Sequence, residues 1–212
     1  MVEPKLGKDA LLDAASLLFD ELGVDAVSLN RINEASGHKN RSAVTYHFGG
    51  KFEVVKALVE RSASLPDAVR GALLDKVERD HSEPGPRVVL EALIGPMSQQ
   101  LETPEGRRHL RLLGHISGHP EYLSATQNLA YAAPNLARCS LHLARHLEHL
   151  PHPLQLERVA LIGGFIVRSY AGQARLLTID DPPRPVLSVD DFTTNLLDLL
   201  LALLLADSTL AT

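Results

Sequence analysis

Groups that bind nucleic acid are concentrated between Ser28 and Lys51, in the stretch SLNRINEASGHKNRSAVTYHFGGK. Four basic residues and one acid give this stretch a formal charge of +3, whereas the whole chain carries −5. Guanidinium, ammonium and hydroxyl groups bond to phosphates and to base edges in the major groove of DNA. The candidate DNA contacts are therefore the polar residues Ser28, Arg31, Lys39, Arg41, Ser42, Thr45, Tyr46, His47 and Lys51.

The spacing of apolar residues in this stretch predicts a helix-turn-helix. Ser28 is a good N-cap for a first short helix, whose apolar residues recur at helical spacing. Gly37 ends this helix, because glycine adopts the left-handed conformation readily. A second helix is expected from Arg41 to Phe48, with Val44 and Phe48 facing inward and the polar residues facing outward. Spacing alone leaves a second interpretation open, in which the two helices are only a solvated pair in an all-α protein.

The stretch from Leu11 to about Arg61 resembles the DNA-binding domain of TetR/AcrR-type transcriptional regulators. The matching segments are ALLDAASLLFDELG, VSLNRINEASG, AVTYHFGGK and FEVVKALVER. The family usually has hydrophobe–Tyr–x–Tyr/His–Phe–x–x–Lys near the end of its recognition helix. This chain reads VTYHFGGK there, so Thr45 replaces the common tyrosine and Tyr46 stands one place later. By resemblance, Lys51 contacts a phosphate.

The resemblance implies an all-α fold with two domains. Residues 1–50 would form a three-helix DNA-binding domain that contains the helix-turn-helix. Residues 51–212 would form a helical bundle for ligand binding and dimerisation. A homodimer would then bind a palindromic DNA operator, more often as a repressor, and a small-molecule effector would release it by shifting the helix that begins at Lys51.

Helix-breaking residues divide the rest of the chain into further expected helices. Pro96 lies inside one of them and should kink it. Kinked helices pack imperfectly and leave cavities that suit small molecules. The expected helices are Lys8–Leu22, Lys51–Ser64, Pro66–Arg79, Arg87–Leu101, Pro104–Ser117, Pro134–His149, Leu154–Thr178 and a last one capped by Ser188 that reaches Leu205, with one of undefined extent through Leu123 and Leu129.

Side chains that could line an effector cavity come from several of these helices. Arg111 and His115 lie on adjacent turns and could orient an acidic ligand, although such residues are more often ordinary surface or interface groups. The candidate ligand-binding residues are Met97, Leu101, Arg111, His115, Tyr122, Phe165 and Tyr170.

The last two helices are the longest and carry the pattern of an interface. Small residues recur at helical spacing in the first, which allows close approach of another helix, and leucines cover nearly all sides of the second. A helix that is apolar all round is buried between neighbours. The resemblance implies a four-helix dimer interface, although a helix at the centre of the monomer core would show the same pattern. The candidate interface residues are Ala160, Gly164, Val167, Ala171, Leu196, Leu200 and Leu203.

A histidine-rich helix supports an alternative function. His142, His146 and His149 fall on one helix face, and two histidines four residues apart can bind one metal ion. Arg138 and Arg145 on the same helix would repel a cation, so we expect a polar exposed face without metal. The alternative is an all-α protein or enzyme that binds a small molecule or metal and does not bind DNA. Because the chain has no Gly-rich phosphate loop, HExxH motif or nucleophile elbow, neither enzymatic activity nor a cofactor is expected.

Composition is that of an ordinary globular protein, with 45% apolar and 22% charged residues among 212. The N-terminus has no apolar signal-peptide core. The longest apolar run, Leu196 to Ala206, is too short to cross a bilayer and contains Asp198. A cytoplasmic protein without a membrane partner is therefore expected. A single cysteine, Cys139, excludes an internal disulfide and is expected to be buried.

Overall fold

The computed structural model describes residues 7–38, 40, 42–80, 83–122 and 133–209. Across these residues the chain forms nine α-helices, one short 3₁₀ helix and no strand. The predicted all-α fold class is therefore confirmed. The elements are α1 (Lys8–Leu22), α2 (Leu29–Ala35), α3 (Ala43–Phe48), α4 (Lys51–Asp80), α5 (Pro86–Leu101), α6 (Pro104–Ile116), η1 (Pro120–Tyr122), α9 (Pro134–Arg145), α10 (His152–Leu176) and α11 (Val189–Leu205).

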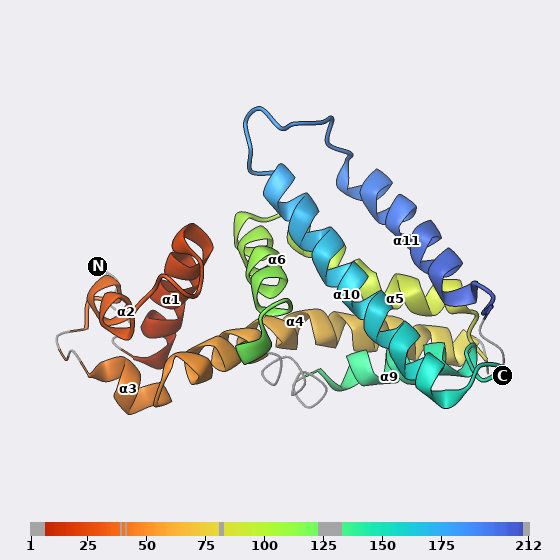
Figure 1. Ribbon diagram of the computed structural model, residues 1–212, viewed down its shortest axis with the longest axis horizontal. Helices are drawn as coiled ribbons and strands as arrows, with labels where there is room; N and C mark the ends of the chain where they lie inside the picture. Colours follow the sequence, from red (N-terminus) through yellow and green to blue (C-terminus); the bar gives the residue numbers. More distant parts are fainter. Residues whose placement is uncertain (1–6, 39, 41, 81–82, 123–132, 210–212) are drawn as a thin grey trace.

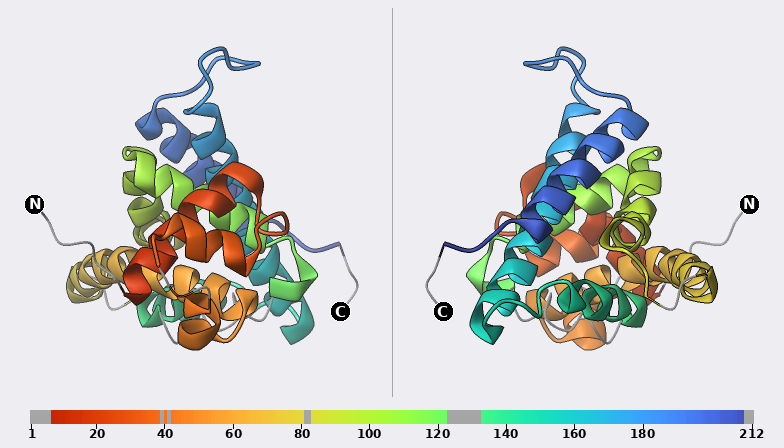
Figure 2. Two further views of the ribbon diagram at one scale, coloured as in Figure 1. Left: turned by 90° about the vertical axis from the view of Figure 1, so that its left-hand side faces the viewer. Right: turned by 90° about the vertical axis from the view of Figure 1, so that its right-hand side faces the viewer.

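The helices form two packed groups that α4 connects (Figure 1). The first three helices pack at one end around a core that includes Phe19, Ile32 and Val44. We call this group the head. The remaining helices pack around a second core that includes Leu90 and Ile94, and we call this group the bundle. Figure 2 shows the connection between α10 and α11 standing out from one side of the bundle.

Helix α4 runs through both groups as one helix of 30 residues. The prediction of two helices that meet near Pro66 is wrong. Proline lacks the N–H that bonds the preceding turn, and this loss normally ends a helix. Here Val55 and Leu58 are buried in the head core and Leu74 is buried in the bundle core, so packing on both sides of Pro66 holds the helix together. A single helix therefore reaches from the head into the bundle.

Helix starts that depend on a nearby cap are placed as predicted. The Thr103 hydroxyl accepts a bond from the Gly106 N–H at 3.0 Å, and the Ser188 hydroxyl accepts one from the Asp191 N–H at 3.1 Å. The boundary between α9 and α10 differs from the prediction: α9 ends at Arg145 instead of His149, and α10 begins two residues before Leu154. Leu147 and Leu150 in the intervening turn are buried in the bundle core, and their burial favours a turn over continuation of the helix.

Helix α6 lies at the centre of the molecule, where it packs against α1, α5 and α10. Two of its glycines permit this close packing. A Cβ atom at Gly106 would overlap the backbone of Gln100, and one at Gly114 would overlap the side chain of Ala171. Helix α6 is therefore held tightly by both the head and the bundle. Among the described helices, none is long and apolar enough to cross a bilayer.

Candidate nucleic-acid interface and bundle cavity

Local hydrogen bonds shape the turn between α2 and α3. The Ser28 hydroxyl accepts a bond from the Arg31 N–H at 3.2 Å and caps α2, as predicted. Gly37 has a φ of +73°, which confirms the left-handed residue expected after this helix. The Asn40 side-chain oxygen accepts a bond from the Ser42 N–H at 2.9 Å, immediately before α3. Ser28 and Asn40 thus supply local hydrogen bonds at the start of α2 and immediately before α3.

Asn33 fixes the orientation of α3 against α2. Its side chain is 2% exposed, and its Oδ1 accepts a bond from the Val44 N–H at 2.9 Å. Val44 is the second residue of α3, and the first N–H groups of a helix have no partner within it. Asn33 therefore caps a helix other than its own. Sequence reasoning missed this role, because an asparagine within a helix gives no local indication of a partner eleven positions away.

The outer face of α3 is polar and open to solvent. Val44 and Phe48 are buried, as predicted from their spacing, and Thr45, Tyr46 and His47 are exposed. The Tyr46 side chain is 82% exposed, and its ring meets the His47 ring edge-on with 5.1 Å between centroids. Three adjacent polar side chains thus stand on a short helix whose opposite face is fixed in the head core.

The other candidate DNA contacts differ in how free their polar atoms are. Arg31 and Ser42 are exposed, and Ser42 occupies the N-cap position of α3, which starts two residues after the predicted Arg41. The Lys51 ammonium donates to the backbone carbonyls of Val24 and Asp25, at 3.1 and 3.2 Å. A phosphate would have to compete with these carbonyls. Lys39 and Arg41 lie outside the described residues.

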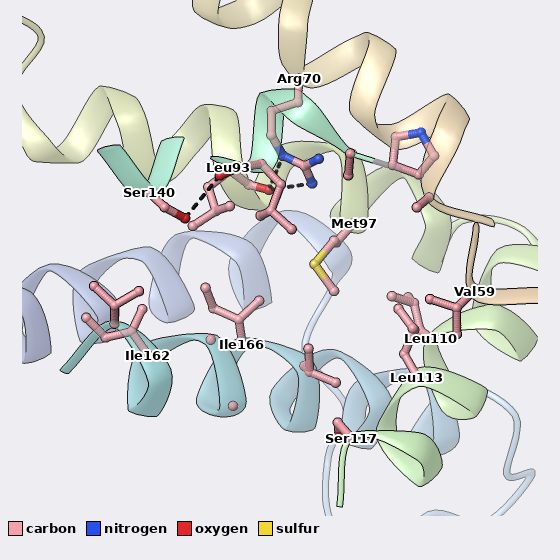
Figure 3. Close-up of a pocket in the computed structure, with 18 of the residues that line it drawn as sticks. Val59, Arg70, Leu93, Met97, Leu110, Leu113, Ser117, Ser140, Ile162 and Ile166 are labelled. Carbon is pink, nitrogen blue, oxygen red and sulfur yellow. Dashed lines mark hydrogen bonds between the residues drawn. The ribbon is translucent and has the colours of Figure 1, made fainter. Parts of the chain in front are cut away.

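A cavity of about 530 Å³ lies between the helices of the bundle. Residues of α4, α5, α6, α9 and α10 line it, with Leu204 of α11. Its walls are mostly apolar, and Figure 3 shows Leu93, Leu113 and Ile166 around the space. A mostly apolar cavity of this size is typical of small-molecule sites.

Of the candidate ligand residues, the structure places Met97 in the wall of this cavity (Figure 3). Leu101 is buried in the bundle core without lining the cavity. Tyr170 is also fully buried: its hydroxyl pairs with the Ser98 hydroxyl at 2.7 Å and donates to the Ile94 carbonyl at 3.2 Å. Burial raises the pKa of Tyr170 to about 12. Tyr170 thus joins α10 to α5 instead of facing the space.

The other candidates lie away from the cavity. Tyr122 is buried in the head core and stacks on Phe52, with 6.3 Å between ring centroids. Burial, followed by the nearby acids, raises the pKa of Tyr122. His115 is exposed on α6, and Phe165 is on the solvent side of α10. The predicted residues are therefore not gathered in one site.

Arg111, the remaining ligand candidate, joins the bundle to the head. Its guanidinium donates two bonds to the Asp20 carboxylate of α1, at 2.7 and 2.6 Å. Both side chains are mostly buried, at 15% and 16% exposed. Arg108 lies 3.8 Å from the same carboxylate. Two parallel bonds between guanidinium and carboxylate constrain both distance and angle, so this pair fixes α1 against α6.

A buried ion pair stands at the edge of the cavity. The Arg70 guanidinium donates to the Asp67 carboxylate at 3.0 Å and to the Leu93 carbonyl at 3.2 Å, a contact visible in Figure 3. The same carboxylate accepts the backbone N–H groups of Asn135 and Leu136, at 3.1 and 3.0 Å, at the start of α9. Arg70 and Asp67 thus hold together α4, α5 and α9.

His109 is the second basic residue that lines the cavity. Its Nδ1 lies 2.6 Å from Oε1 of Gln100, which can only accept, so Nδ1 carries the hydrogen. Burial lowers the pKa of His109 to about 4, so the ring is neutral at physiological pH. Its Nε2 is closed to solvent and has no hydrogen-bond partner.

The candidate dimer residues divide into two sets. Ala160, Gly164 and Leu203 are exposed, and Val167 is half-buried. Ala160, Gly164 and Val167 also line the bundle cavity. The other three are buried within the chain: Ala171 lies against Gly114 of α6, and Leu196 and Leu200 belong to the bundle core. Helix α11 is therefore not buried on every side of a single chain, since Leu199, Leu203 and Leu205 remain exposed.

The prediction that His142, His146 and His149 lie on one helix face is wrong, because α9 ends at Arg145 and contains only His142. His142 Nε2 lies 2.8 Å from the Glu78 carboxylate, which also accepts a bond from Arg138 at 2.7 Å. The bonds from His142 and Arg138 lower the pKa of Glu78. In the part of the chain that the structure describes, no three His, Cys, Asp or Glu side chains are placed to hold a metal. Cys139 is fully buried, as predicted, and burial raises its pKa to about 11.

A helix-turn-helix head on a bundle with an internal cavity has the architecture of TetR-type regulators, and the predicted resemblance is confirmed for the fold. Among solved structures, the chain is similar to the fatty acid degradation regulator FadR from Bacillus halodurans, with 15% identity, a TM-score of 0.57 and coverage of 91% of this chain and 97% of that one. It is similar to AmtR from Mycobacterium smegmatis, with 18% identity, a TM-score of 0.54 and coverage of 93% and 86%. It is also similar to the TetR family regulator PfmR from Thermus thermophilus, with 20% identity, a TM-score of 0.47 and coverage of 90% of this chain and 96% of that one. No family model and no curated protein matches the sequence.

Proposed function

We propose that the chain is a cytoplasmic, homodimeric transcriptional repressor that binds a palindromic DNA operator and is released by a small-molecule effector. The observation that carries this proposal is the outer face of α3, where Thr45, Tyr46 and His47 stand exposed on a helix fixed by Asn33. Two such helices in a dimer would enter successive major grooves. One structural relative, FadR, is a regulator of fatty acid degradation, which agrees with a regulatory function.

The continuous helix α4 supports a mechanism of release. Lys51 lies at its head end, and Pro66 and Arg70 line the cavity further along. Movement of α4 at the cavity would therefore change the position of the head. An effector can shift the distance between two heads only if it binds one arrangement better than the other.

Selection of bound fragments from a random DNA pool, near physiological salt, tests this function. We expect an enriched palindrome with half-sites about one helical turn apart, or somewhat more. The matched control is the double variant Thr45→Ala/Tyr46→Ala, which changes exposed side chains only and should enrich nothing. If the folded wild-type protein also enriched no sequence, the proposal would be wrong, and an all-α small-molecule protein without DNA binding would become the better interpretation.

A further inference from the structure

The cavity of the bundle offers little to a charged ligand. Apart from serine hydroxyls and Gln100, the polar side chains of its described wall are Arg70 and His109, and no acid lines it. Whether these two basic groups present positive charge decides which ligands the cavity accepts. An ionised ligand that leaves water needs a partner of opposite charge.

The charge of the Arg70 guanidinium is already paired with a buried carboxylate, and three of its five N–H groups have partners. It donates one bond to Asp67 and two to the Leu93 carbonyl, at 3.0, 3.4 and 3.2 Å, and its side chain is 6% exposed. Asp67 in turn accepts the N–H groups at the start of α9. A ligand anion that drew Arg70 away would leave Asp67 buried without its cation, which is strongly unfavourable.

The imidazole of His109 presents a lone pair and no charge. Because Nδ1 donates to Gln100, Nε2 is the acceptor of a neutral ring. Among the buried side-chain nitrogens and oxygens of the residues that line the described cavity wall, this Nε2 alone has no hydrogen-bond partner. Because it is closed to solvent, a ligand hydroxyl reaches it only when neighbouring side chains shift. An uncharged hydroxyl can donate to it, whereas a carboxylate has no hydrogen to donate.

We propose that the cavity binds an uncharged, mostly apolar molecule that carries a hydroxyl group, and not a carboxylate or phosphate. The hydroxyl bonds to His109, and the apolar part packs among the leucines and isoleucines of α5, α6 and α10. The regulatory consequence rests on the function proposed above. The binding itself does not, because it is measured without DNA.

Decan-1-ol and decanoate form a matched pair of probes, since they share chain length and differ in charge. Displacement of the uncharged dye Nile red, at about pH 8, reports both affinities in the absence of tryptophan. We expect the alcohol to displace the dye at a concentration about tenfold lower than decanoate, because the carboxylate must lose its hydration without gaining a cation. Equal or stronger displacement by decanoate, or displacement by neither probe, would overturn the proposal.

Two variants on α10 establish where the probe binds. A Cβ at Gly163 or at Gly172 would meet no atom within 4 Å, so both positions accept a larger residue within the chain. Gly163 lines the cavity and Gly172 does not. Gly163→Phe should abolish displacement by decan-1-ol, and Gly172→Phe should leave it unchanged. Equal behaviour of the two variants would place the probe elsewhere and contradict the proposal.

His109→Leu tests the hydroxyl contact. In the wild-type protein, decan-1-ol should bind more tightly than 1-methoxydecane, an ether that has no hydrogen to donate. In the variant this preference should disappear, because the acceptor is gone. A preference that survives would show that His109 does not meet the hydroxyl. A protein that binds decan-1-ol and selects no DNA would contradict the regulatory function alone, whereas one that selects a palindrome and prefers decanoate would contradict only the ligand class.

Discussion

At the scale of single residues, Tyr46, which is proposed to contact DNA, and Asn33, which orients its helix, differ in burial. Tyr46 is exposed and makes few contacts within the chain, so its side chain is available to contact a partner. Asn33 is buried and has its oxygen committed to α3. Substitutions at these two residues should therefore separate DNA affinity from stability.

Tyr46→Ala should weaken operator binding by about 1–3 kcal/mol, the usual worth of a specific groove contact. The free energy of unfolding should change by less than about 0.5 kcal/mol, because the side chain is 82% exposed. Fluorescence anisotropy with the selected palindrome and denaturant unfolding measure the two quantities. The control is Leu141→Ala, a change of similar exposure on α9. Unchanged affinity would remove Tyr46 from the DNA site.

Asn33→Ala should reduce stability and DNA affinity together. It leaves the Val44 N–H buried without its partner, which costs about 1–3 kcal/mol. The substitution also removes the hydrogen bond that holds α3 at its angle to α2. Denaturant unfolding and the same anisotropy assay test this prediction. An Asn33→Ala protein that is as stable as the wild type would mean that water replaces the bond and that Asn33 does not fix α3.

His109 should make stability fall in acid. Its pKa is about 4 in the folded chain and 6.5 in the unfolded one, so above pH 6.5 the ring is neutral in both states. Below pH 6.5 the unfolded chain binds a proton that the folded chain refuses, and the free energy of unfolding falls by roughly 3 kcal/mol before pH 4 is reached. In His109→Gln this fall in the free energy of unfolding should be smaller than in the wild type by that amount. In the control His149→Gln, which changes an exposed residue, the fall should equal that of the wild type. Parallel pH profiles for all three proteins would contradict it.

At the scale of elements, local signals predicted helix starts well and helix continuity poorly. Thr103 and Ser188 cap the helices that they precede, because a cap bonds an N–H only a few residues away. Pro66 gives an equally clear local signal for a break, but burial of residues on both sides in two separate cores overrides it. Which cores a helix joins depends on the whole fold, and no short stretch of sequence contains that information.

The same distinction explains how much of each candidate site was predicted. The inward and outward faces of α3 follow from helical period alone, so Val44 and Tyr46 are placed as expected. The cavity wall depends on the rotation of five helices about their axes, and among the candidate ligand-binding residues Met97 alone lines it. Arg111 has the charge of a ligand-binding residue, but Asp20 lies 91 positions earlier in the sequence and takes its guanidinium.

The contact between α1 and α6 can be tested with a double-mutant cycle. Alanine at Asp20 and Arg111, singly and together, should give a coupling energy of about 2 kcal/mol, because the pair is bidentate and mostly shielded from water. The pair of Asp13 with Arg61 joins the same helix α1 to α4, but its side chains are 66% and 36% exposed. Its coupling should stay below about 1 kcal/mol. Equal couplings would mean that Asp20 and Arg111 do not fix the head against the bundle.

At the scale of the whole molecule, one side of the bundle remains apolar after the single chain has folded. Leu161 and Phe165 of α10 and Leu199 and Leu203 of α11 are exposed there, although buried residues of the same helices complete the bundle core. Exposed apolar side chains on two neighbouring helices make this side a candidate contact with another protein. The dimer that the proposed repressor requires would use this side, and the interface would set the separation of the two heads in the DNA-binding arrangement.

Gly164→Glu should therefore separate the dimer without unfolding the chain. Gly164 is exposed and also lines the cavity, and a Cβ there meets no atom within 4 Å, so a single chain has room for the larger residue. Against a second copy, the glutamate would bury an unpaired charge, which two neighbouring apolar helices cannot accommodate. Light scattering should give twice 23.1 kDa for the wild type and for Leu141→Glu on α9, and 23.1 kDa for Gly164→Glu.

Operator affinity should fall with the loss of the dimer, because two half-sites are then no longer bound at once. A Gly164→Glu protein that remains dimeric would place the contact on another surface.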